Sequence, residues 1–324
     1  MSLDGTLFPD TERQSIKIYR AIKSSIIIPG RRLHQDPKSN HFDIIGQAKL
    51  KLPAIPSQHF KYSRLIHTNQ NELLLAGPEE CSILSGSKWK FHSKFNEFML
   101  ATIIINMPNG VYVFGISKPP PEKDVSYFLP NQSNIWQNGP NLPEKGRVSS
   151  CGLAISQSEF LLIGGVIDSG DVFQAIPCSK IWKYNINIEE WQMIGNIQDP
   201  RFLASAAIFN DRLIITGGGF GPAFLEGKFE LKIVETTEII SLEKLKNLAA
   251  GDKVITKRIK VPRLKREVMP NLGIVRNQGV PKLIAFGGAK EIEEWNDEDE
   301  KWDISKYLSM PEARSSFGYC YSPT

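Results

Sequence analysis

The sequence has little of the chemistry that metal sites and disulfide-bonded domains need. None of its four cysteines lies in a CxxC pair or at a metal-ligand spacing from a histidine. All five histidines fall in the first third of the chain, and no two have the spacing of a helical or zinc-finger site. We therefore expect reduced, mostly buried thiols, no bound metal and no cofactor.

Long apolar runs are also missing. The longest, "MLATIIINM" (99–107), is about half of the ~20 residues that a membrane-spanning helix requires. The first residues, "MSLDGTLFPDTERQ", have no basic start followed by an apolar stretch, as a signal peptide would. We expect a protein of the cytoplasm, or of the nucleus, that does not bind membranes.

Charge of one sign is scarce as well. The 324 residues carry a net charge of only +4, which does not favour nucleic acid as a partner. The chain is 41% hydrophobic and 23% charged, so it can bury a large core. No G-x-S-x-G motif is present, and the glycine-rich "GGGFGPAF" (217–224) is not followed by a helix start that could cradle a phosphate.

What the chain does contain is a repeat. An apolar run that ends in glycine occurs six times, 38 to 70 residues apart: "SIIIPG", "LLLAG", "VYVFG", "LLIGG", "LIITGG" and "LIAFGG", ending at Gly30, Gly77, Gly115, Gly165, Gly218 and Gly288. Most copies follow a short polar turn and a second apolar stretch, which predicts a β-hairpin. Because neither strand alternates with polar residues, both faces must be covered, and radial packing of several sheets satisfies this.

A polar loop and then an aromatic pair follow the glycines. Tyr184 and Trp191 have six residues between them, Trp295 and Trp302 have the same spacing, and Phe128 precedes Trp136 with seven. This pattern resembles the kelch repeat. The segments "MPEARSSFGYC" (310–320), "LPEKGRVSSCGLAI" (142–155) and "DPRFLASAAI" (199–208) are similar to the stretches that open the innermost strand of each kelch unit.

The resemblance implies an all-β fold: a six-bladed kelch-type β-propeller with four-stranded blades. The C-terminal strand would pair with the N-terminal blade and close the ring. Residues 1–15 would form a flexible tail, and 16–324 a single propeller. The predicted blades are blade 1 at 20–55 plus 312–324, blade 2 at 56–94, blade 3 at 95–142, blade 4 at 143–197, blade 5 at 198–262 and blade 6 at 263–311. A short amphipathic helix is expected near 241–251, between two strands of blade 5.

Kelch proteins commonly bind partners on the face built from the loops after the Gly-Gly pairs and the segments that open the innermost strands. Mapped onto this chain, that face gives the candidate partner-binding residues Arg64, Arg147, Ser149, Arg201, Arg314, Ser315, Asp168, Phe220 and Phe224. Three of the arginines occupy equivalent places, so they could form a guanidinium-lined mouth suited to carboxylates. Alternatively, each arginine bonds the carbonyls of its own blade. The two phenylalanines could line the site or pack on the adjacent loop.

The first functional hypothesis is a protein-interaction module, an adaptor or scaffold and by resemblance a possible substrate receptor. Its partner would be a protein or peptide, acidic or presenting its C-terminal carboxylate, and the chain would act as a monomer. The alternative is an enzyme similar to sugar mutarotases of kelch type, with Glu267 or Asp168 acting beside Arg201.

Overall fold

A computed structural model describes most of the chain. The described residues are 25–28, 43–46, 64–68, 70, 72–85, 88–118, 123–144, 150–168, 175–220, 232–247, 254–259, 271–277, 280–287 and 289–309. Within these ranges no helix reaches the length and apolarity that crossing a membrane requires.

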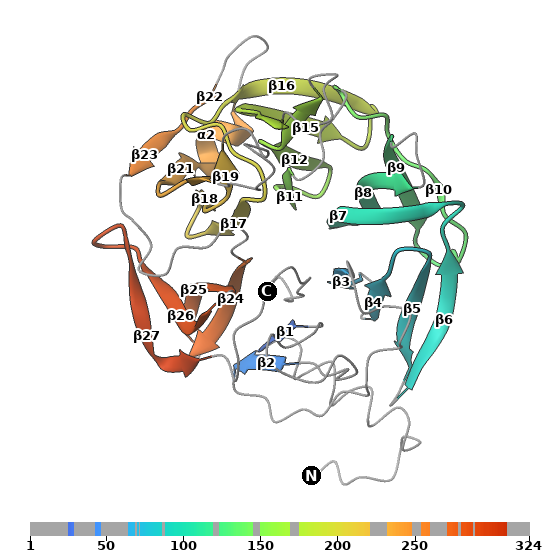
Figure 1. Ribbon diagram of the computed structural model, residues 1–324, viewed down its shortest axis with the longest axis horizontal. Coiled ribbons are helices and arrows are strands. Elements are labelled where there is room, and N and C mark those ends of the chain that lie inside the picture. The colour runs from blue at the N-terminus through green and yellow to red at the C-terminus, as the bar shows by residue number, and fades with distance from the viewer. Residues whose placement is uncertain are drawn as a thin grey trace, which may run out of the picture.

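Five sheets, each built on four antiparallel strands, surround a common centre, which makes the molecule a β-propeller (Figure 1). Each sheet falls within one of the ranges predicted for blades 2 to 6, and we keep those numbers. Their strands are β3–β6 (Arg64–His67, Leu73–Ala76, Glu80–Ser85, Lys88–Lys94), β7–β10 (Phe98–Met107, Gly110–Lys118, Asp124–Pro130, Gln137–Asn138), β11, β12, β15 and β16 (Cys151–Ala154, Glu159–Ile163, Lys180–Asn185, Glu190–Asn196), β17, β18, β21 and β23 (Ser205–Phe209, Arg212–Thr216, Thr237–Ser241, Lys257–Ile259), and β24–β27 (Asn271–Asn277, Val280–Gly287, Ala289–Asn296, Lys301–Ser309).

The predicted count of six four-stranded blades must be corrected to five among the described residues, and these do not close the ring. Blade 1 is represented there by one hairpin, β1 (Ser25–Ile28) with β2 (Asp43–Gly46), which contacts β24 and β27 (Figure 1). The physical reason is visible in the sequence: "SIIIPG" has no apolar run before it that could supply an innermost strand. The predicted closing strand (312–324) and the tail (1–15) lie outside the described residues.

Apolar clusters fill the four interfaces between neighbouring blades from blade 2 to blade 6. Between blades 3 and 4, for example, Tyr112 and Phe114 pack with Phe160 and Tyr184, and the Phe160 and Tyr184 ring centroids lie 5.1 Å apart. Wide flat rings suit a wedge that opens away from the axis. Similar clusters join blades 2 and 3, 4 and 5, and 5 and 6. The fold therefore depends on contacts between sheets, as the apolar pattern predicts.

The aromatic pairs explain the six-residue spacing. Tyr184 and Trp191 are direct cross-strand partners on β15 and β16, with ring centroids 4.8 Å apart, and Trp295 and Trp302 are equivalent at 5.2 Å. Six intervening residues are the length that brings both rings to one face of a hairpin.

In blade 3 the extra residue changes the pairing. Phe128 faces Gln137, while Trp136 packs on Phe95, in the linker after blade 2, at 4.7 Å and donates from Nε1 to Ser93 Oγ of blade 2 at 3.0 Å. Trp302 likewise donates to Thr237 Oγ1 of blade 5 at 3.0 Å. In both cases the indole joins its own blade to the preceding one, so it contributes a directional bond as well as buried area.

The predicted helix is present but shorter than expected. α2 (Leu242–Lys246) begins directly after Ser241, which occupies the N-cap position without a side-chain capping bond. Leu242 and Leu245 are buried in the cluster between blades 4 and 5, beside Ile194. The helix is thus part of the interblade core and not an exposed docking element.

The segment after α2 links two blades. β22 (Val254–Ile255) pairs in parallel with the outer strand β16 of blade 4, and β23 then pairs with β21 of blade 5. Blade 4 therefore gains a fifth strand from the neighbouring blade, which covers part of an otherwise open sheet edge.

Candidate functional site at the loop end of blades 4 and 5

The two ends of the propeller have different connections. Because the strands alternate in direction, the turns between strands one and two, and three and four, lie at one end, which we call the turn end. The loops after the second strand and the linkers between blades lie at the other, the loop end. In blade 4 this is seen directly, since Ile197 of the linker donates from N to the Ser179 carbonyl of the loop at 2.8 Å.

At the loop end, blades 4 and 5 each carry a small hairpin directly after their glycine pair. The first consists of β13 (Val166–Asp168) and β14 (Ala175–Pro177), the second of β19 (Gly219–Phe220) and β20 (Lys232–Ile233). β14 contacts β19, so the two lie side by side. We call them the paired hairpins.

The paired hairpins expose apolar side chains. Ile176 on β14 is 45% exposed and Phe220 on β19 is 41% exposed. The cross-strand partner of Phe220 is Lys232, also exposed. An apolar contact beside a cation is thus available to a partner at this end.

The glycine pairs make room for the linker. Gly164 has a φ of 66°, and a Cβ there would lie 2.4 Å from the Arg201 carbonyl oxygen; Gly218 has a φ of 89°, and a Cβ there would lie 2.7 Å from the Phe202 carbonyl oxygen. Left-handed backbone and so close an approach both require glycine. The backbone of residues 201 and 202 therefore crosses directly over both glycine pairs.

Arg201 is fully buried at this crossing. Each of its five N–H groups donates within the protein, to the carbonyls of Asp199 (from Nε, 3.0 Å), Gly217 (3.2 Å) and Thr236 (2.9 Å), to Thr236 Oγ1 (2.8 Å) and to Glu238 Oε1 (2.7 Å). Burial lowers the pKa of this guanidinium, and the charges of Glu238 and Asp199 oppose that shift. The predicted alternative in which the arginine bonds its own blade is the one that the geometry supports.

Glu238 is equally buried and completes the pair. Besides the guanidinium, its carboxylate accepts hydrogen bonds from the backbone N of Asp199 at 3.0 Å and of Gln198 at 2.7 Å, and from Thr256 Oγ1 at 2.5 Å. A buried ion pair needs such additional bonds to offset the loss of hydration. Thr256 lies between β22 and β23, so the network reaches the outer edge of the blades.

The other predicted site residues are placed as follows. Arg64 begins β3, an innermost strand, and is half-buried, whereas Asp168 ends β13. Phe220 lies exposed on the paired hairpins. The remaining candidates lie outside the described residues: Arg147, Ser149, Phe224, Arg314 and Ser315. The prediction of Arg201 in an open, guanidinium-lined mouth was wrong, because the Glu238 carboxylate encloses it.

One exposed residue was missed by the sequence analysis. Ile176 lies in the post-glycine loop, where only its place after a glycine pair could have indicated a surface role. Ser150, which directly precedes the innermost strand of blade 4, is buried, and its Oγ donates to the Gly164 carbonyl at 2.9 Å. Its role there is to support the glycine turn.

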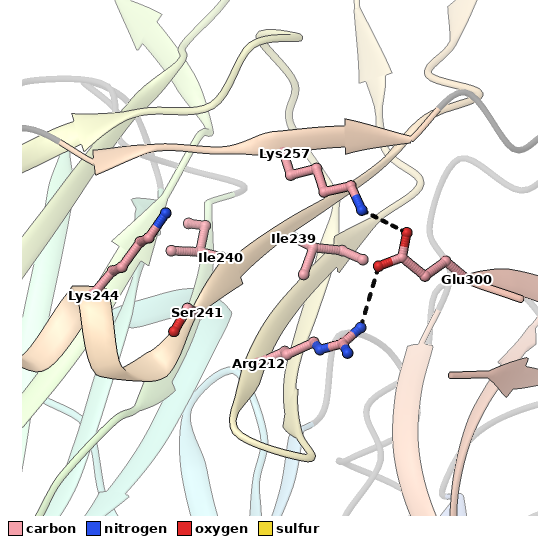
Figure 2. A pocket seen from close by; sticks show the side chains of 7 residues that line it. All are labelled: Arg212, Ile239, Ile240, Ser241, Lys244, Lys257 and Glu300. Carbon is pink, nitrogen blue, oxygen red and sulfur yellow. Dashed lines mark hydrogen bonds and ion pairs between the residues drawn. The ribbon is translucent and has the colours of Figure 1, made fainter. Parts of the chain in front are cut away.

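A shallow pocket of about 220 Å³ lies elsewhere, between blades 5 and 6 (Figure 2). It is lined by Arg212, Ile239, Ile240, Ser241, Lys244, Lys257 and Glu300. Glu300 bridges two of its cations, Lys257 at 2.7 Å and Arg212 at 3.3 Å, and Arg212 also lies 3.4 Å from Asp297. Since these cations already have carboxylate partners from the next blade, the arrangement is an interblade clamp.

Among the residues that the structure describes, no group of three or more His, Cys, Asp or Glu side chains is placed to hold a metal ion. No known protein-family model matches the chain, and no curated protein matches its sequence. What the fold defines is the class: an all-β propeller of four-stranded antiparallel blades, with one short helix among the described residues.

Proposed function

We propose that this chain is a kelch-type propeller that acts as a protein-interaction module and contacts its partner through the paired hairpins. The observation that carries the proposal is the side-by-side placement of β14 and β19, which carry the exposed Ile176 and Phe220, at one end of the ring.

The chemistry of this surface favours a peptide with apolar anchors and an acidic group. Large apolar side chains grouped on a rigid support are typical of the energetic centre of an interface. Lys232 lies opposite Phe220 and would face the acidic group. Arg147, which precedes the innermost strand of blade 4, and Arg314, in the predicted closing strand, are the expected further cations. Phe224 is expected to provide a further apolar contact.

The enzymatic alternative is less well supported. It requires an arginine beside Asp168 or Glu267, yet all five N–H groups of Arg201 already donate to protein acceptors. In addition, a sugar needs several polar partners in its site. The innermost strands, which would line such a site, carry the half-buried apolar side chains of Ile66, Leu153 and Ile274. We therefore expect an adaptor or scaffold, acting as a monomer in the cytoplasm or nucleus.

The proposal is tested by quantitative affinity purification with three forms of the full chain. These are the wild type, Ile176→Ser with Phe220→Ser, and the matched control Ile135→Ser with Ile188→Ser, which alters two exposed isoleucines at the turn end. We expect at least one specific partner to fall about tenfold or more with the first double variant and to stay with the control. Equal recovery with all three forms would reject the paired hairpins as the contact surface.

The preference for acidic groups needs its own variant. Arg147→Ala with Arg314→Ala should weaken the same interaction, whereas Arg201 is left intact because its loss would disturb the fold. If the double arginine variant binds as well as wild type, the carboxylate component of the proposal is wrong while the apolar component stands.

A further inference from the structure

We infer that Arg201 is a positioning residue: a shared anchor that fixes the two hairpins relative to one another and so sets the spacing of Ile176 and Phe220. The expected effect of Arg201 on partner binding rests on the proposed function, whereas its expected effect on the geometry of the hairpins does not. The inference follows from two separate sets of contacts, one made by the main chain of this residue and one by its side chain.

The main chain of Arg201 holds the base of the first hairpin. Its carbonyl accepts from Gly165 N at 2.9 Å, and its N donates to the Cys178 carbonyl at 3.2 Å. Gly165 directly precedes β13 and Cys178 directly follows β14, and Cys178 N donates back to the Gly165 carbonyl at 2.8 Å. Both legs of the hairpin are therefore tied to one residue of the linker.

The side chain of Arg201 holds the base of the second hairpin. Nη1 donates to the carbonyls of Gly217 and Thr236, one before β19 and one after β20. Nη2 adds a bond to Thr236 Oγ1 at 2.8 Å. The next residue, Phe202, exchanges two backbone hydrogen bonds with Gly219, at 3.1 and 2.9 Å. The second hairpin is thus tied at both legs to the same short piece of linker.

Only arginine can make this set of contacts. The planar guanidinium offers five donors in a fixed arrangement, whereas a lysine ammonium offers three on a flexible stem. The charge itself is held by Glu238, which also accepts bonds from the backbone N of Gln198 and Asp199. The linker, the guanidinium and both hairpin bases therefore form one connected unit. A substitution of Arg201 should loosen the bases of both hairpins together.

Hydrogen exchange of the free, full-length protein tests this. In Arg201→Lys, which keeps a cation beside Glu238, we expect amide exchange at Cys178 and at Gly219 and Val234 to accelerate about tenfold or more, while amides of β7–β8 stay unchanged. The matched control is Lys183→Met, which removes a mostly buried ion pair with Glu159 (3.0 Å) in blade 4. The control should leave both hairpin bases as in wild type.

A milder second variant tests the same inference if Arg201→Lys does not fold. Thr236→Val removes the hydroxyl that accepts from Arg201 Nη2 and donates to Asp199 Oδ2, and it leaves the Arg201–Glu238 pair in place. If Arg201 is the shared anchor, exchange should rise at Cys178 as well, on the first hairpin. An increase confined to the second hairpin, or an equal increase across all blades, would overturn the inference.

The two proposals can fail separately. The exchange experiment uses no partner, so it tests the anchor alone. The Ile176 and Phe220 double variant leaves Arg201 and its bonds unchanged, so it tests the contact surface alone. If the partner is lost with that variant and exchange behaves as predicted, Arg201→Lys should also weaken partner binding while the Lys183→Met control does not.

Discussion

The turn end and the loop end of the same blades are built in different ways. At the turn end, short local turns reverse the chain, and left-handed residues such as Glu189, Asn210 and Glu300 sit in them. At the loop end, linker residues from the next blade hold the glycine turns and the hairpins through bonds that are distant in sequence. Local sequence therefore builds the turns of one end, where ion pairs such as Arg212–Glu300 are added between blades, whereas the backbone of the loop end is held by the linkers of the assembled ring.

The charged side chains of the two ends also differ in how deeply they are buried. Arg201 and Glu238 are completely enclosed at the loop end, whereas Arg212 and Glu300 at the turn end keep side-chain exposures of 35% and 28%. A buried charge that loses its partner is strongly destabilising, whereas a solvated one is screened. Equivalent substitutions at the two ends should therefore have unequal effects.

The largest difference is expected for the buried ion pair. Arg201→Met leaves the Glu238 carboxylate without its cation and should reduce the free energy of unfolding by about 3–5 kcal/mol. Glu300→Gln at the turn end should reduce it by about 1 kcal/mol or less. Urea unfolding of both variants measures this, and a loss below about 1 kcal/mol for Arg201→Met would show that the pair is not as enclosed as described.

The glycine turn gives the next largest effect. Gly164→Ala places a Cβ against the Arg201 carbonyl in left-handed backbone, so we expect a loss of about 2 kcal/mol or more. Glu189→Gly, at a left-handed position of the turn end, should change stability by less than about 1 kcal/mol. Thermal unfolding of the two variants compares them, and similar losses would contradict the difference between the ends.

The indole bonds between blades should have a smaller effect. Trp302→Phe keeps an aromatic ring but removes the donor to Thr237 Oγ1, which should reduce stability by about 1 kcal/mol. Thr237 keeps its contact with Thr216 Oγ1 at 3.1 Å, which limits the loss. Urea unfolding of Trp302→Phe, alone and combined with Thr237→Val, measures the bond. Additive losses in the double variant would show that the bond contributes nothing.

The smallest effect concerns pH at the turn end. Burial raises the pKa of Asp297, but hydrogen bonds from Asn210 and Trp295 and the charge of Arg212 outweigh it, so the net pKa lies below the ordinary value of an aspartate. A lowered carboxyl pKa stabilises the fold above the unfolded-state value and loses this contribution as pH falls through the folded-state value. Asn210→Ala should flatten the fall of thermal stability below pH 4, and an unchanged profile would argue against this assignment.

The features that could be predicted from the sequence are the local ones, and those that could not are distant in sequence. The glycine-ended strands and the six-residue aromatic spacing are local patterns, and they predicted the blades and the Tyr184–Trp191 and Trp295–Trp302 pairs. The burial of Arg201 could not be read locally, because Glu238 lies 37 residues away. The parallel pairing of β22 with β16 joins two blades across 59 residues and leaves no periodic signal.

The candidate site was predicted less completely than the fold. The sequence analysis grouped the post-glycine loops with the segments that open the innermost strands, and their role in binding stays a prediction; Phe220 lies exposed at this end. Ile176 was missed because a single isoleucine has no period. Trp136 does not pair with Phe128 as expected, because one additional residue in the turn shifts the register.

The central claim is that partners bind at the loop end of blades 4 and 5, and site-specific photo-crosslinking tests it most directly. A photoreactive residue is placed at exposed Lys232 on the paired hairpins, and in a second form at exposed Asn187 at the turn end. We predict a covalent partner adduct from position 232 and none from position 187. Equal labelling at both positions, or labelling at 187 alone, would contradict the claim.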